Sequence, residues 1–83
     1  MKTIVRKGSN VSLYLIEDSV YVNIAGDRTT IGNPATLYVA DCNTSNAILF
    51  EGVIDPGEWR GWKYLYTAEG GWVLNPDWNP SEA

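Results

Sequence analysis

Apolar and polar residues alternate with a period of two along most of this chain, and this alternation constrains the fold more than any other feature of the sequence. In VSLYLI, residues 11–16, odd-numbered side chains point to one face of an extended strand and even-numbered ones to the other. VYVNI, residues 20–24, alternates in the same way. No window shows the 3.6-residue apolar stripe and end caps of a helix. The pattern therefore predicts an all-β chain with little or no helix.

Turn-forming residues divide the alternating segments at intervals of roughly eight to twelve residues, which is typical of small sandwiches and barrels. We expect a small antiparallel β-sandwich or a partly open barrel, built from hairpins or a meander. The expected strands cover residues 3–6, 11–16, 20–24, 29–31, 36–40, 47–50, 62–67 and 72–75.

Two segments have the strongest hairpin signals, residues 11–24 and residues 62–75. In the first, Tyr14 and Tyr21 are expected to pair across the two strands on the face away from the core. In the second, the turn falls at AEGG, and Trp62 and Trp72 lie within the strands. The aliphatic residues expected to face the core in the first hairpin are Val11, Leu13, Leu15, Val20, Val22 and Ile24.

The length of 83 residues fits one domain with one modest core. We assign residues 1–75 to this β domain. Residues 76–83, PDWNPSEA, carry two prolines and are expected to form an extended tail along the surface or toward a neighbour.

Oxygen-bearing side chains of the kind that Ca²⁺ binds occur in and after the polar segment DCNTSN, residues 41–46. Their spacing matches no calcium-loop pattern, so we interpret them as loop caps that bond to nearby backbone groups. A single cysteine excludes an internal disulfide, and without histidine there is no Cys/His set for structural zinc. We expect no metal and no cofactor. The candidate Ca²⁺ ligands that we interpret in this way are Asp41, Asn43, Asn46 and Asp55.

Catalytic groups are scarce. Serine and cysteine nucleophiles need a nearby base, usually histidine, and the chain has none. Cys42 follows Asp41, whose charge disfavours a thiolate, so we expect a packed, unreactive thiol. Glu51 with Asp55 or Glu58 offers the carboxylate pair that glycosidases use, but so short a chain rarely builds the cleft that this chemistry needs. We expect no enzyme activity and assign no catalytic residues.

The formal net charge of −4 argues against nucleic-acid binding, because that function needs a basic surface. The basic residues Lys2, Arg6 and Lys7 cluster near the N-terminus, where they form either a solvated strand or a contact with an acidic partner. No run of about 18 apolar residues predicts a membrane span, and no secretory signal is expected at the N-terminus.

All four tryptophans lie between Trp59 and Trp78, and two interpretations of this segment remain open. Exposed indoles beside asparagine and aspartate are typical of a carbohydrate-binding surface. Alternatively, the aromatic residues anchor contacts between protein subunits. Trp62 and Trp72 are expected to build the fold, whereas Trp59 and Trp78 lie in loop-like contexts. The candidate partner-binding residues are Trp59, Arg60, Asp77, Trp78, Lys2, Arg6 and Lys7.

The order NVSLYLIEDSV, GDRTTIGNPATLYVADCNTSNAILFEGV, PGEWRGWKYLY and GGWVLNPDW resembles a group of short, uncharacterised proteins from phages of marine and cyanobacterial hosts. The resemblance covers nearly the whole chain. It implies a phage origin and an accessory role in the virion, as a capsid decoration or cement protein or a small tail or fibre component. It also implies other virion proteins as partners. Because so short a chain has neither a disulfide nor a structural zinc site to support its core, we also expect self-association into a homo-oligomer. Binding to host-surface glycans is the alternative function.

Overall fold

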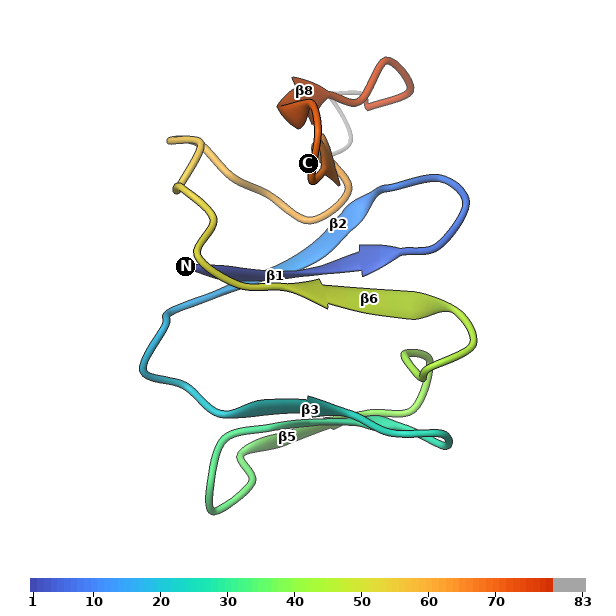
Figure 1. Cartoon of the computed structure of the whole chain (residues 1–83), viewed down its shortest axis with the longest axis vertical. Coiled ribbons are helices and arrows are strands. Elements are labelled where there is room, and N and C mark those ends of the chain that lie inside the picture. Colours follow the sequence, from blue (N-terminus) through green and yellow to red (C-terminus); the bar gives the residue numbers. More distant parts are fainter. Residues whose placement is uncertain (79–83) are drawn as a thin grey trace.

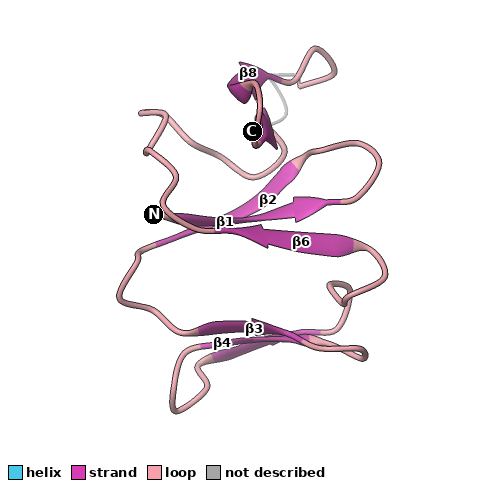
Figure 2. Ribbon diagram, viewed as in Figure 1, coloured by secondary structure: helices cyan, strands magenta, loops and turns pink. Residues whose placement is uncertain are grey.

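The computed structural model describes residues 1–78 and contains eight short strands, all paired antiparallel (Figures 1 and 2). These residues include no helix, and thus none long and apolar enough to cross a membrane. The prediction of an antiparallel all-β fold is confirmed. The strands are β1 (Lys2–Arg6), β2 (Ser12–Ile16), β3 (Val22–Ile24), β4 (Thr29–Ile31), β5 (Leu37–Val39), β6 (Ala47–Phe50), β7 (Tyr64–Thr67) and β8 (Gly71–Leu74).

The strands form three small sheets stacked in a sandwich-like arrangement. In Figure 1 the middle sheet, ordered β2-β1-β6, lies between the sheet β3-β4-β5 below it and the β7-β8 hairpin above it. The middle sheet is therefore covered on both faces. In its central strand β1, the three consecutive residues Thr3, Ile4 and Val5 are buried, although their side chains point to alternate faces.

Strand β1 is the centre of the middle sheet and the most deeply buried element. Ile4 is fully buried on the side of β3-β4-β5, where it packs with Ile31, Cys42 and Ala47. Thr3 and Val5 point to the opposite face and are also buried. The half-buried residues packed around the Ile4 cluster are Leu13, Tyr14, Ile16, Val20, Val22, Ile24, Val39 and Leu49.

The β7-β8 hairpin is joined to the edge of β2 by backbone hydrogen bonds. Tyr66 N donates to Asn10 O at 2.9 Å, and an isolated bridge links Val11 with Leu65. On one face of the hairpin, Trp72 packs edge-on against Tyr64 and Tyr66, with ring centroids 5.8 and 4.8 Å apart. The hairpin expected over residues 62–75 is thus present, but it is stabilised by aromatic contacts instead of an aliphatic core.

The hairpin expected over residues 11–24 is wrong. Strand β2 pairs with β1, and β3 pairs with β4 in a different sheet, so Tyr14 and Tyr21 are not cross-strand partners. A β-bulge between Ile4 and Val5 also shifts the register of β2. Tyr14, which was assigned to the outer face, lies directly opposite Ile4 and packs against the Ile4 cluster.

The polar loop over residues 41–46 is closed by its own side chains, as expected. Asn43 Oδ1 accepts from Ser45 N at 2.9 Å, and Asn46 Oδ1 accepts from Asn43 N at 2.8 Å. Asn46 also donates to Asp41 O. Asp55 likewise accepts from the Gly57 amide. Of the four candidate calcium ligands, Asn43, Asn46 and Asp55 therefore cap loops with their side chains, whereas Asp41 takes part through its backbone carbonyl.

Candidate functional site

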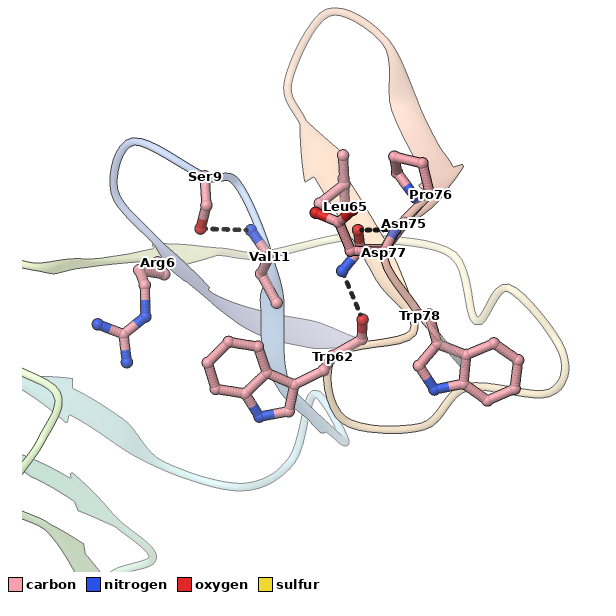
Figure 3. A pocket seen from close by; sticks show the side chains of 9 residues that line it. All are labelled: Arg6, Ser9, Val11, Trp62, Leu65, Asn75, Pro76, Asp77 and Trp78. Carbon is pink, nitrogen blue, oxygen red and sulfur yellow. Dashed lines mark hydrogen bonds between the residues drawn. The ribbon is translucent and has the colours of Figure 1, made fainter. Parts of the chain in front are cut away.

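An open groove with a volume of about 750 Å³ lies where the β1-β2 turn meets the β7-β8 hairpin (Figure 3). It brings together parts of the chain that are far apart in sequence, because the hairpin docks on the edge of β2. The residues that line it are Arg6, Ser9, Val11, Trp62, Leu65, Asn75, Pro76, Asp77 and Trp78.

Trp62 is the central aromatic residue of this groove and has an unusual backbone conformation. Its φ angle is 72°, in the left-handed region that bulky residues rarely adopt. Two hydrogen bonds hold it there: Trp62 N donates to Ser12 O at 3.2 Å, and Asn75 Nδ2 donates to Trp62 O at 2.9 Å. Its side chain is nevertheless 54% exposed. The backbone of Trp62 is thus fixed by hydrogen bonds, while its large ring remains in contact with solvent.

Arg6 lies beside Trp62, with the guanidinium carbon 5.6 Å from the ring centroid. In the view of Figure 3 the Trp62 indole lies between Arg6 and Trp78. Among residues 1–78, no carboxylate forms a salt bridge with Arg6, and its buried Nε atom has no hydrogen-bond partner. The cation–π contact with Trp62 is the main interaction that orients this guanidinium.

The opposite side of the groove is a turn closed on Asn75. Trp78 N donates to Asn75 O at 3.1 Å, and Asp77 N donates to Asn75 Oδ1 at 3.0 Å. Trp78 is half-buried and lies 5.0 Å from the ammonium group of Lys63, measured to the ring centroid. Residues 76–78 thus begin the expected tail with a turn, while residues 79–83 lie outside the described residues.

Lys63 supports this side of the groove from behind. It is only 8% exposed, and its ammonium group donates to Glu58 O at 2.9 Å while lying 3.7 Å from the Glu58 carboxylate. The rings of Tyr64 and Trp78 both form cation–π contacts with this ammonium group. The cation–π contact with this ammonium group favours the observed position of the Trp78 ring.

The structure brings together three of the seven residues predicted to bind a partner, namely Arg6, Asp77 and Trp78. Trp59 lies elsewhere, where its indole Nε1 donates to the buried Ser12 hydroxyl at 2.9 Å, so it ties the 51–61 segment to β2. Arg60 is exposed outside the groove.

The predicted N-terminal basic cluster is divided by the fold. Lys2 Nζ donates to Val20 O at 2.7 Å, and Lys7 Nζ donates to Thr44 O at 2.6 Å. Each lysine therefore satisfies a backbone carbonyl of a different loop. Of the three basic residues, only Arg6 lines the groove.

Trp62 lines the groove but is not among the residues predicted to bind a partner. Alternation placed it inside a strand and predicted that it builds the fold, but β7 begins two residues later, at Tyr64. The adjacent Gly61 was the one local signal for a turn. Trp72 is half-buried in the ring cluster, as predicted, and its Nε1 donates to Ile54 O.

The chemistry of the groove suits binding. It contains two indole rings, one guanidinium, one carboxylate and the two neutral polar side chains of Ser9 and Asn75. The thiol of Cys42 lies in the core, where burial is the main cause that raises its pKa, with Asp41 raising it further and Arg6 opposing. No group of three or more acidic, histidine or cysteine side chains suited to hold a metal occurs in residues 1–78.

Comparison of the chain with protein-family models, curated protein sequences and solved structures finds no match.

Proposed function

We propose that the protein is a non-enzymatic accessory component of a phage particle, which binds its neighbours through aromatic side chains. It serves either as a capsid decoration or cement protein or as a small tail or fibre component. Its neighbours are other virion proteins and further copies of itself. The observation that carries this proposal is Trp62, which is 54% exposed and held at a φ of 72° beside Arg6.

The conformation of Trp62 opposes folding in two ways. A left-handed backbone at a bulky residue costs on the order of 1–3 kcal/mol. An exposed indole also forgoes much of the stabilisation that burying a large ring provides. Such a residue contributes little to the stability of the isolated chain, which supports a role in binding. Tryptophan and arginine are, moreover, among the residues that contribute most to protein interfaces.

Several groove residues are also held by contacts within the chain. Asn75 bridges the Trp62 carbonyl and the Asp77 amide, while Lys63 forms a cation–π contact with Trp78. Pre-ordered side chains lose less conformational entropy on association. The absence of histidine from the chain and the raised pKa of the buried Cys42 thiol support a non-enzymatic role.

The direct test is mass spectrometry of purified particles of the phage that encodes the chain. Peptides of this protein at a copy number matching capsid or tail subunits are expected. In a second assay, Trp62→Ala should reduce co-sedimentation of added protein with particles that lack it. Tyr38→Ala is the matched control, because Tyr38 is 56% exposed and stacked with Arg28 on a distant sheet. Absence from the particles would overturn the proposal.

A second candidate function, binding of host-surface glycans, is favoured by one feature of the groove. Two indoles lie beside the polar residues Ser9, Asn75 and Asp77 in an open depression of about 750 Å³. Sugar rings stack on flat aromatic faces, and polar groups beside them select the hydroxyls. Titration of tryptophan fluorescence with host glycans tests it. A saturable change that Trp62→Ala or Trp78→Ala abolishes, with Tyr38→Ala unaffected, would favour this function over the first.

A further inference from the structure

Along the outer edge of β8, backbone groups lack a backbone partner within residues 1–78, and their positions follow from the hydrogen bonding of the hairpin. Asn75 N donates to Lys63 O at 2.8 Å, just beyond the strand ends. Hydrogen-bonded and non-hydrogen-bonded pairs alternate in an antiparallel ladder. The pairs Leu65 with Val73 and Thr67 with Gly71 therefore carry the bonds between β7 and β8. It follows that the backbone groups of Trp72 and Leu74 point outward from the hairpin.

The other edge of the hairpin confirms this alternation. Tyr66 pairs with Trp72, and its amide points away from β8 to donate to Asn10 O at 2.9 Å. On the β8 side, no backbone acceptor for the amides of Trp72 and Leu74 occurs within residues 1–78. The β7 edge of the hairpin is thus bonded to the edge of β2. The β8 edge forms no backbone hydrogen bond with a further strand within residues 1–78.

The free edge is apolar in its middle. Val73 is 52% exposed on one face of the hairpin and Leu74 is 56% exposed on the other. Ile54, which is 80% exposed, lies close by, because its carbonyl accepts the hydrogen bond from Trp72 Nε1. Natural edge strands usually carry a charge or a proline that blocks further pairing, and β8, of sequence GWVL, carries neither.

The charges lie at the two ends of this edge, and both are acidic. Glu69 precedes β8 in the turn and Asp77 follows it, and both are exposed. The nearest cation in the sequence, Lys63, is buried against Glu58. A second copy of the same strand would bring acidic ends against acidic ends, which opposes pairing. A strand with basic ends is complementary.

We propose that β8 is the docking edge for an extended segment of another protein, with alternating apolar residues between lysine or arginine residues. The segment adds as a third strand to β7-β8, bonding to the backbone of Trp72 and Leu74 and covering Val73 and Leu74. Peptides bind sheet edges widely in this way. The surface shares Asp77 with the Trp62 groove, but the β8 backbone, Val73 and Leu74 lie outside the residues that line it. The proposal does not depend on the function proposed for that groove.

The test uses short capped peptides that alternate valine and threonine, with lysine at both ends or with glutamate at both ends. The lysine-ended peptide should slow hydrogen exchange of the Trp72 and Leu74 amides. The glutamate-ended peptide should bind roughly tenfold more weakly, because attractive cross-strand charge pairs at both ends become repulsive ones. The double variant Glu69→Lys, Asp77→Lys should reverse this preference.

A backbone variant tests the geometry independently of charge. Leu74→Pro removes an outward amide and none of the hydrogen bonds to β7, so it should abolish peptide binding while the hairpin persists. The unchanged ring contacts of Trp72 in near-ultraviolet circular dichroism would show that persistence.

Three results would overturn the proposal. The first is that neither peptide slows hydrogen exchange of the Trp72 and Leu74 amides. The second is that both peptides bind equally tightly. The third is self-association of the protein alone that Leu74→Pro abolishes, which would assign the edge to a second copy.

Discussion

The sandwich formed by the two three-stranded sheets and the β7-β8 hairpin are stabilised differently. The sandwich has a largely aliphatic core around Ile4, which is fully buried and packs with the buried residues Ile31, Cys42 and Ala47. The hairpin instead packs half-buried rings edge to edge and leaves Trp62, Val73 and Leu74 more than half exposed. The difference teaches that one part of the molecule supplies most of the buried core, while the other leaves large aromatic and aliphatic side chains exposed to solvent. Each prediction below tests this division.

The largest effect is expected from Ile4→Ala in the sandwich. Deleting a fully buried aliphatic side chain costs about 2–5 kcal/mol of unfolding free energy, because it removes packing and leaves a cavity. Urea unfolding followed by far-ultraviolet circular dichroism measures this loss. Ile54→Ala is the matched control, since Ile54 is 80% exposed and its truncation should change stability by less than about 0.5 kcal/mol. Equal losses at the two isoleucines would contradict the division.

Trp72→Ala should affect the hairpin more than the sandwich. Two edge-on ring pairs, with Tyr64 and Tyr66, are lost, each contributing about 0.5–1.5 kcal/mol, so the local opening free energy should fall by roughly 1–3 kcal/mol. Native-state hydrogen exchange measures it. The Leu65 and Val73 amides should exchange faster while Ile4 keeps its protection. If Ile4 loses protection in parallel, the hairpin and the sandwich form one cooperative unit.

The positions of the strands could be predicted from the sequence, but their partners could not. Every expected strand is present within one or two residues of its observed bounds, because local alternation and turn residues define them. From the sequence, β2 could pair along one edge with either β1 or β3. In the structure it pairs with β1. Alternation is equally compatible with both partners. Only the burial of β1 on both faces selects the observed order.

The candidate site was predictable only in part, for a related reason. Trp78 and Asp77 stand out in the sequence because prolines place them outside a strand. The exposure of Trp62 depends on a backbone conformation set by Ser12 and Asn75, which are distant in sequence. No local pattern encodes such contacts. Trp59, in an equally loop-like context, is instead tied down by Ser12.

The buried thiol of Cys42 predicts a smaller, pH-dependent effect in the sandwich. Its pKa is raised in the folded protein above the ordinary value of 9.0, chiefly by burial. The unfolded chain therefore releases this proton first, and stability that is present below about pH 9 falls as the pH rises further. Urea midpoints measured on either side of this pH should show the fall. Cys42→Ala should reduce this fall of stability with pH. If stability falls equally steeply with pH in the variant, other titrating groups cause the fall.

The smallest effect, and the sharpest test of the division, is expected from Trp62→Gly. Glycine adopts a φ of 72° without strain, which offsets the lost contact with Arg6 and the greater freedom of the unfolded chain. The unfolding free energy should therefore change by less than about 1 kcal/mol, whereas Trp62→Ala, which keeps the strain, should lower it more.

Tyr38→Gly is the control for Trp62→Gly, because both rings are about half exposed and both stack with an arginine. Tyr38 lies in β5 and has no left-handed backbone, so glycine there weakens the strand by roughly 0.5–1 kcal/mol in addition to the lost contacts. Equal losses at the two positions would mean that the Trp62 backbone is not strained. If Trp62→Gly leaves stability intact, the fold retains this indole without a stability benefit, as expected of a residue that binds a partner.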